Sequence, residues 1–539
     1  MKTLSYVVIL LLCSVFPVRA AMVYSSDCAE PPSTFGNVWY VDPVHGNTPA
    51  AGGTGKQAQP WNSLSGILSG NWATGGWTLP GYTRPLLSTV PYYHITSAGR
   101  VVVADSIGNP PVRPGDAIML MSGNYGDITI GSYAREVTNP SFVTVQAAPG
   151  QTPVLSTLSI VSTNNWVFNG LKVQSLYTSA NTLPLIYIHD QGASLPTANI
   201  VLENMTLSSQ DDAEAWSQAQ WIANARSGFY AWSSAPGTNT SCISFTGSHI
   251  SNVRFGASLA ANQLIFSNNQ IDHFGDDGID YAASDIAITR NDIHDNLNLG
   301  DGNHEDGMQG VIGFVPAGAT VNHLKNILID SNLVIRQTDP ELSFPTGLQG
   351  ISAFDSDWTN LTVTNNVVIT SACAGISFAS IHDSLIAHNT VVEDGLVSTP
   401  GCTAAINAGG ASHEGSVSTN SVVQNNLSTQ LNVDTRNGGV VAEYNVVMCC
   451  VEPAISWYVN GVVQYLGKPG NTYGNHNLID MGGVKSEFLN FNPATLTYNV
   501  MLKSGAPAIN AGTSGAPTVD ILGATRKTPF AVGAYAYPY

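Results

Sequence analysis

Short runs of alternating hydrophobic and polar residues recur from about residue 160 onward. Each run is followed by an asparagine, one further residue and an aliphatic side chain. Clear copies are LIFSNNQI (264–271), IAITRNDI (286–293), ILIDSNLV (327–334), LTVTNNVV (361–368) and LIAHNTV (385–391), and weaker ones are VVQNNL (422–427) and AEYNVV (442–447). The shortest gaps between the final aliphatic residues are 20, 22 and 23 residues, and longer gaps fit one unit plus an inserted loop. This period predicts short strands in repeated coils.

A second pattern confirms the period within the same coils. The aligned segments are 255–258, 277–280, 306–309, 346–349 and 374–377. Strand alternation then predicts one inward column and one outward column. The inward column would hold Ala257, Ile279, Met308, Leu348 and Ile376, and the outward column Asp280, Gln309, Gln349 and Ser377. The asparagines of the first pattern predict a stacked structural ladder of Asn269, Asn291, Asn332, Asn366, Asn389, Asn425 and Asn445.

A coil of this length cannot bury its apolar side alone, so the coils must stack and pair their strands with those above and below. We therefore predict an all-β fold, a single-stranded parallel β-helix (solenoid) with N-terminal and C-terminal caps and inserted loops. Residues 21–159 would form the N-terminal cap, an elaborated loop and the first coils. Residues 160–484 would form the β-helix core, and residues 485–539 the C-terminal cap, since the period breaks there.

The inserted loops are expected to leave the solenoid at the same corners. The largest one, Asp211 to Ser241, begins with a possible helix and is rich in aromatic residues: Trp216, Trp221, Phe229, Tyr230 and Trp232. We expect these rings to pack the loop against the solenoid. Stacking on sugar rings is the alternative.

The first twenty residues have the features of a secretory signal peptide. Lys2 precedes an apolar run from Leu4 to Phe16, and Val18-Arg19-Ala20 fits a cleavage site. Without Lys2 and Arg19, the chain has 17 basic and 37 acidic residues, a balance of −20. This charge argues against nucleic acid and against a membrane surface as partners. We expect a secreted or periplasmic monomer.

Six cysteines follow the signal segment, and export permits disulfides among them. Cys373 and Cys402 lie about one repeat apart and are the preferred pair, with buried free thiols as the alternative. No cysteine spacing resembles a zinc site.

Acidic residues are concentrated between Ile271 and Gln309, although charged residues make up only 10% of the chain. The repeat alignment places Asp276 and Asp277 beside Glu305 and Asp306 of the next coil, about 4.8 Å away. Asp280 lies one step along the strand, His304 precedes the upper pair, and Arg254 lies one coil below.

Carboxylates stacked this closely either bind a cation or keep protons at raised pKa. Ca²⁺ accepts several oxygen ligands, so Asp276, Asp277, Glu305 and Asp306 are the candidate metal ligands. The candidate catalytic residues are Asp277, Asp280, His304, Asp306 and Arg254. The alternative is a solvated polar face without chemistry.

Three segments give the chain a family resemblance: YVDPVHGN…GGTGKQAQPWNSL, PGDAIMLMSGNYGDITI and SGAPAINAGT…VDILGATR…VGAYAY. They resemble exported right-handed parallel β-helix proteins of the pectate-lyase-like superfamily. The resemblance implies a right-handed coil and a long, often acidic polysaccharide bound along one face. Members include calcium-dependent lyases, epimerases, inverting hydrolases and phage-type depolymerases, and the fold alone does not choose among them.

The favoured hypothesis from sequence is a lyase or C5-epimerase that acts on a uronic-acid polymer, with Ca²⁺ as the candidate cofactor. Arg254, His304, Arg290 and Lys325 are the candidates for the base, with His304 and Arg254 preferred. An inverting hydrolase is an alternative, because Asp276-Asp277 resembles the aspartate pair of the polygalacturonase-type hydrolases. However, Arg254-Phe255-Gly256 stands where that family has Asn-Thr-Asp. A non-catalytic glycan-binding adhesin is the other alternative.

Overall fold

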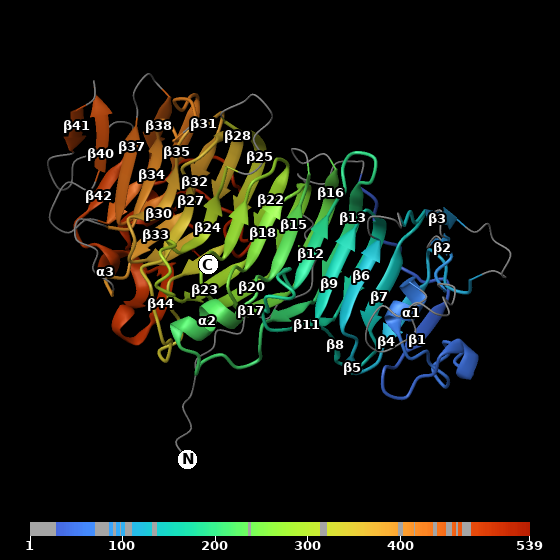
Figure 1. Cartoon of the computed structure of the whole chain (residues 1–539). Helices are drawn as coiled ribbons and strands as arrows, with labels where there is room; N and C mark the ends of the chain where they lie inside the picture. Colours follow the sequence, from blue (N-terminus) through green and yellow to red (C-terminus); the bar gives the residue numbers. More distant parts are fainter. Residues whose placement is uncertain are drawn as a thin grey trace, which may run out of the picture.

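Three long parallel sheets wind along the molecule in the computed structural model (Figure 1). The structure describes residues 28–69, 86–89, 93–96, 99–102, 110–131, 137–234, 239–312, 321–396, 403–413, 415–434, 439–448, 455–459, 462–465 and 476–538. The predicted signal peptide lies outside these residues. No helix in this part of the chain is both long and apolar enough to cross a bilayer.

Nearly every coil contributes one strand to each sheet. Strands of the same sheet pair in parallel from coil to coil, and only the last two strands of the third sheet, among the described residues, pair antiparallel. Sheet 1 contains β1 (Val38–Val41), β4 (Ala117–Leu120), β7 (Val143–Ala147), β10 (Asn164–Asn169), β13 (Thr197–Glu203), β16 (Thr240–Thr246), β19 (Asn262–Ser267), β22 (Ile286–Thr289), β25 (His323–Asp330), β28 (Asp357–Thr364), β31 (Ile381–His382), β32 (Leu385–Ala387), β35 (Ser421–Gln424) and β38 (Val440–Glu443).

Sheet 2 contains β5 (Gly123–Asn124), β8 (Pro153–Leu155), β11 (Lys172–Gln174), β14 (Thr206–Ser208), β17 (His249–Val253), β20 (Gln270–Phe274), β23 (Asp292–Asn296), β26 (Leu333–Ile335), β29 (Val367–Thr370), β33 (Thr390–Glu393), β36 (Leu427–Ser428), β39 (Val446–Met448) and β42 (Leu478–Asp480).

Sheet 3 contains β6 (Asp127–Gly131), β9 (Thr157–Val161), β12 (Ile186–His189), β15 (Phe229–Trp232), β18 (Ala257–Ala260), β21 (Ile279–Tyr281), β24 (Asp306–Gly310), β27 (Gln349–Ala353), β30 (Ala374–Phe378), β34 (Ala405–Gly409), β37 (Gln430–Asp434), β40 (Ile455–Val459) and β41 (Val462–Tyr465). Three sheets with one strand per coil make a parallel β-helix, and such crossovers are right-handed. The predicted fold class is therefore confirmed.

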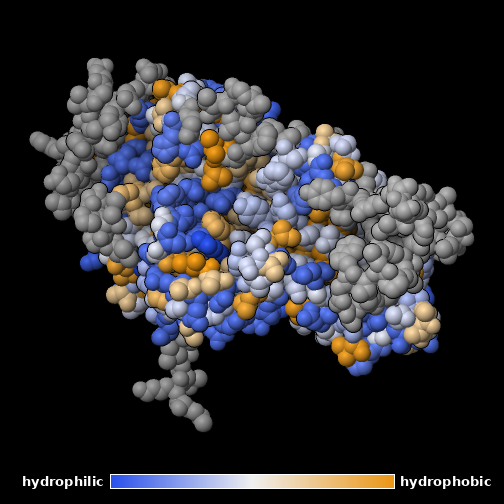
Figure 2. Space-filling model, viewed as in Figure 1, coloured by the Kyte–Doolittle hydropathy of each residue, from blue (hydrophilic) through white to orange (hydrophobic). Residues whose placement is uncertain are grey.

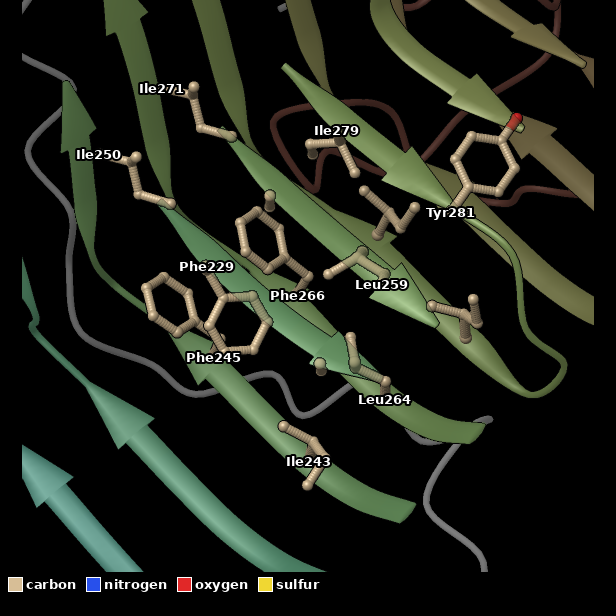
Figure 3. Packing of buried hydrophobic residues seen from close by; sticks show 14 of the residues in the cluster. Phe229, Ile243, Phe245, Ile250, Leu259, Leu264, Phe266, Ile271, Ile279 and Tyr281 are labelled. Carbon is tan, nitrogen blue, oxygen red and sulfur yellow. The ribbon is translucent and has the colours of Figure 1, made fainter. Parts of the chain in front are cut away.

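The interior of the solenoid is a continuous apolar column (Figure 3). Phe229, Phe245 and Phe266 come from neighbouring coils, and the rings of Phe245 and Phe266 stack with centroids 5.3 Å apart. Phe229 is fully buried and pairs with Ala257 in β18. It belongs to a coil strand, β15, which the sequence analysis assigned to a loop.

The asparagine ladder is present, with one member corrected and one added. The side-chain nitrogen of each asparagine donates to the side-chain oxygen of the next at 2.9–3.1 Å. The members are Asn269, Asn291, Asn332, Asn366, Asn389, Asn426, Asn445 and Asn477. The prediction of Asn425 was wrong, because the following strand begins directly after Asn426; Asn425 instead donates to the Thr513 carbonyl.

The C-terminal segment lies along the solenoid as well as at its end. It begins with α3 (Val484–Glu487) and the antiparallel pair β43 (Phe488–Asn492) and β44 (Thr497–Leu502), and 3-10 turns lie at Pro493–Thr495 and Pro507–Asn510. Its apolar residues, including Phe488 and Val532, pack on the outer side of β29, β33, β36 and β39. The tail thus covers the outer face of sheet 2, a larger role than closing strand edges.

The remaining elements lie mostly at the N-terminal end and in one insertion. They are the 3-10 turn Pro49–Ala51, α1 (Leu64–Ser69), the antiparallel pair β2 (Tyr93–Thr96) and β3 (Gly99–Val102), and α2 (Gln218–Asn224) in the insertion.

A disulfide joins Cys28 to Cys242, which ties the N-terminal segment to β16. Such a bond fits a protein that folds outside the reducing cytosol. Cys373 is also disulfide-bonded. Its predicted partner, Cys402, lies outside the described residues, so this pairing stays a prediction.

Candidate active site

The acidic residues gather at the corner where the chain passes from sheet 2 to sheet 3. Asp276 and Asp277 follow β20, and Asp280 lies in β21. One coil further, Glu305 and Asp306 occupy the same corner at the start of β24. The register pairs Ile279 with Met308 and Asp280 with Gln309, as the repeat alignment predicted.

Asp277 and Asp306 are linked through the backbone of the second coil. The Asp306 amide N–H donates to Asp277 Oδ1 at 2.9 Å. Asp306 itself is fully buried, and its two carboxylate oxygens accept from Ser352 Oγ (2.9 Å) and from His304 Nδ1 (2.9 Å). The position of Asp306 is therefore fixed from three sides, and it holds Asp277 in place.

Asp277 and Asp280 form a hydrogen-bonded carboxyl pair. Burial, together with the charges of Asp280 and Asp306, raises the pKa of Asp277 to about 9. Burial also raises the pKa of Asp280, to about 7, although its hydrogen bond with Asp277 partly opposes this. Two interacting carboxyls of this kind titrate as a unit, and at neutral pH the pair holds at least one proton. Asp280 Oδ1 is buried and has no hydrogen-bond partner.

Asp276 lies beside this pair but forms an ion pair with Arg254. Arg254 Nε donates to Asp276 Oδ2 at 2.7 Å, and Arg254 Nη2 to Asp301 Oδ2 at 2.7 Å. Burial raises the pKa of Asp276 to about 6 in spite of the arginine. Asn296, buried beneath, donates to the Asp276 carbonyl at 2.9 Å. Since Arg254 is held by two acids, it is poorly suited to removing a proton from a substrate.

His304 and Glu305 form the outer rim. The His304 side chain is 63% exposed, and its hydrogen bond to Asp306 raises the pKa of the imidazole to about 9. His304 is therefore a cation at neutral pH, not a free base. Glu305 Oε2 accepts from Thr346 Oγ1 at 3.0 Å, and burial raises the pKa of Glu305.

The predicted calcium ligands do not converge on a common point. Within the described ranges, no group of three or more His, Cys, Asp or Glu side chains is arranged to hold a metal ion. Asp277, Glu305 and Asp306 each direct at least one oxygen at an N–H or O–H donor, and Asp276 faces Arg254. The donor set of Asp276, Asp277, Glu305 and Asp306 thus fits carboxyls that hold protons better than a Ca²⁺ shell.

Three inserted loops, each between a strand of sheet 2 and the next strand of sheet 3, pack together beside the site. Trp221 of α2 is buried against Leu297, Leu299 and Leu342, and Trp216 packs on the same cluster. Figure 1 shows α2 lying across the front of the molecule near β17, β20 and β23. The expectation that the aromatic residues of the largest insertion pack the loop is confirmed for Trp216 and Trp221. Phe229, Tyr230 and Trp232 are instead part of β15.

One stretch of the repeat alignment was wrong. Asp306 pairs with Gln349 and Met308 with Ile351, so Ile351 belongs to the inward column in place of Leu348, and Ser352 to the outward column in place of Gln349. The alignment therefore missed Ser352. Thr346, which the alignment paired with Asp306, contacts Glu305 instead. The other proposed bases are remote from the site: Lys325 lies in β25 of sheet 1 and Arg290 in the turn after β22.

Comparison with known proteins yields structural neighbours only. No family model and no curated protein matches the chain. The crystal structure of pectate lyase Pel9A is 12% identical, and the match covers 93% of this chain and 97% of that one, with a TM-score of 0.32. The A-module of the mannuronan C-5 epimerase AlgE6 of Azotobacter vinelandii is 15% identical over 68% of this chain and 89% of that one, with a TM-score of 0.39.

A GH136 lacto-N-biosidase from Eubacterium ramulus is 11% identical over 76% of this chain and 67% of that one, with a TM-score of 0.40. The β-helix assignment rests on the strand pairing of this chain, and the chemistry must be inferred from its own site.

Proposed function

We propose that this protein is a secreted glycoside hydrolase that cleaves a polysaccharide bound across sheet 3. The observation that carries the proposal is the carboxyl pair Asp277–Asp280, buried at the corner of the sheet with pKa values of about 9 and about 7. A carboxylic acid that stays protonated at neutral pH beside an ionised one is the requirement for hydrolysing a glycosidic bond.

In the proposed reaction, protonated Asp277 gives its proton to the glycosidic oxygen as the bond from this oxygen to the anomeric carbon breaks. A water molecule attacks the anomeric carbon and loses a proton to the Asp280 carboxylate. The sum is hydrolysis, and a single displacement inverts the anomeric centre. In most inverting enzymes the two carboxyls lie about 6.5–9.5 Å apart, which leaves room for a water molecule. Asp277 and Asp280 are hydrogen-bonded to each other and are therefore closer together. The substrate and the water must therefore enter between them and replace their hydrogen bond.

The surrounding residues support this division of roles. Both carboxylate oxygens of Asp306 are engaged, one by Ser352 and one by His304, so we assign it as a positioning residue that fixes Asp277 and His304. Arg254 positions Asp276. The cationic His304 on the rim balances the single negative charge that the pair carries before and after the proton transfers.

A lyase or C5-epimerase is the second candidate, and one observation favours it. The exposed His304 cation could neutralise a uronate carboxylate, as the first step of β-elimination requires. The weakness of this candidate is the base, because Arg254 is held by two acids and His304 carries a proton at neutral pH.

The test is incubation of the purified protein with xylan, galactan, mannan, β-glucan, polygalacturonate and alginate. Reducing ends without ultraviolet absorbance from unsaturated sugars are the expected result. Asp277→Asn should lower the rate about 10²–10⁴-fold, the usual contribution of a general acid. Asp383→Asn, the same change at an exposed turn of the solenoid, should leave the rate unchanged.

Unsaturated ends would replace the hydrolase with the lyase. Binding without any cleavage would favour the adhesin alternative, and an Asp277→Asn variant with more than a tenth of the wild-type rate would remove Asp277 from the mechanism.

A further inference from the structure

Four aromatic rings form a platform on the outer face of sheet 3, two coils before the acids. They are Tyr187 and His189 in β12, and Tyr230 and Trp232 in β15. The register pairs Tyr187 with Tyr230 and His189 with Trp232, so the four side chains form two adjacent outward columns. We call them the aromatic platform.

The rings of the platform pack against one another. Tyr187 and His189 stack with centroids 4.4 Å apart, and Tyr187 meets Tyr230 edge-on at 6.4 Å. Trp232 is 37% exposed, an unusual degree for the largest apolar ring on a coil strand. Burial lowers the pKa of His189, so its ring is neutral and acts as a further flat surface.

The platform and the acids lie on one line across the sheet. Tyr230 pairs with Ser258, and Ser258 pairs with Asp280. Two strand spacings separate Tyr230 from Asp280, about 10 Å, which a disaccharide spans. Between them the outward positions of β18 are the small residues Ser258 and Ala260, which leave room for a sugar ring.

The outward column through Asp280 carries no cationic side chain among the described strands. Its members are Thr129, Ser159, Tyr187, Tyr230, Ser258, Asp280, Gln309, Ser352, Ser377, Asn407 and Asn432. Hydroxyls and amides can hydrogen-bond neutral sugars, whereas a polyanion would meet Asp280 in this column. The cations at the neighbouring corner, His304 and Arg254, are already paired with acids of the site. In Figure 2 the visible face is a mixture of hydrophilic and pale, intermediate residues, with hydrophobic ones scattered.

We propose that the aromatic platform is a binding subsite for an uncharged sugar unit, and that the polysaccharide this protein takes is neutral. The substrate would run across the coils, with one ring stacked on Tyr230 and Trp232 and the cleaved bond at Asp280. This differs from the acidic polymer expected from the sequence. The statement that this neutral polysaccharide is cleaved at Asp280 rests on the proposed function. The statement that a sugar unit binds the aromatic platform does not depend on it.

The test measures binding without turnover, in the Asp277→Asn background. Affinity electrophoresis in gels containing xylan, galactan, mannan, β-glucan, polygalacturonate or alginate reports the dissociation constant for each. A neutral polysaccharide should retard the protein, and Trp232→Ala and Tyr230→Ala should each weaken this binding about tenfold. Phe35→Ala, the loss of an exposed ring outside sheet 3, should have no effect.

Retardation only by polygalacturonate or alginate, no retardation at all, or binding that survives both platform substitutions would each overturn the proposal. The two proposals fail separately. If the wild type cleaves nothing while binding depends on Trp232, only the hydrolase is lost. If the wild type cleaves a polysaccharide and Trp232→Ala changes neither KM nor binding, only the platform is lost.

Discussion

The asparagine ladder should contribute more to stability than its polar character suggests, and Asn332→Ala tests this. Asn332 is fully buried. Its amide nitrogen donates to the Ile288 carbonyl and to Asn366 Oδ1, each at 2.9 Å. Its oxygen accepts from the backbone N–H and the side-chain N–H of Asn291, each at 2.9 Å.

Removal of the Asn332 side chain leaves these two donors of Asn291 without their acceptor inside the solenoid. A buried donor that loses its partner costs about 1–3 kcal/mol, so the free energy of unfolding should fall by about 2–6 kcal/mol. Asn407→Ala is the matched control. The Asn407 side chain makes three hydrogen bonds on the outer face, where water can replace them: it donates to Ser377 and to the Cys373 carbonyl and accepts from Asn432. This variant should lose less than about 1 kcal/mol.

The assay is guanidinium denaturation followed by tryptophan fluorescence and by far-ultraviolet circular dichroism, with both variants and the wild type measured at one pH. Coincident transitions allow the midpoints to be converted to free energies. If Asn332→Ala loses no more stability than Asn407→Ala, the ladder is not a buried hydrogen-bond network of the kind described.

Two further predictions concern the C-terminal segment and calcium. Glu487 is fully buried, and burial raises its pKa from 4.5 to about 8. The folded chain therefore holds a proton that the unfolded chain has lost, so the free energy of unfolding should fall as pH rises from about 4.5 to about 8. Glu487→Gln should reduce this slope in thermal unfolding scans, and an unchanged slope would contradict the buried position of Glu487. Because the acids of the site face hydrogen-bond donors, EDTA should leave the cleavage rate unchanged; a loss that Ca²⁺ restores would reinstate the calcium site.

The parallel β-helix could be predicted from the sequence alone, because this fold repeats its side-chain pattern in every coil. It also brought Asp276 and Asp277 beside Glu305 and Asp306, since both coils carry an Asp-Gly pair followed by an apolar residue, at Asp277 and at Asp306. The alignment failed at residues 346–352, where Thr346-Gly347-Leu348-Gln349 imitates the pattern of the preceding coil. The true strand begins three residues later, which is how Ser352 was missed.

Other features depend on burial and on contacts between residues far apart in the sequence, and no local sequence pattern encodes either. The strand β15 was hidden inside an insertion, so Tyr230 and Trp232 seemed to be loop residues. Cys28 and Cys242 are 214 residues apart, and no spacing rule pairs them. The raised pKa values of Asp277 and Asp280 arise mainly from burial, which the acidic run of the sequence does not reveal.

The central claim is that one proton held between Asp277 and Asp280 drives cleavage, and the pH dependence of kcat/KM tests it most directly. The measurement uses the polysaccharide that the panel identifies and counts reducing ends. The account predicts a bell-shaped profile that rises near pH 7, where the pair loses its first proton, and falls near pH 9, where it loses the second. A profile with its maximum at pH 4–5, where ordinary carboxyls titrate, would contradict it.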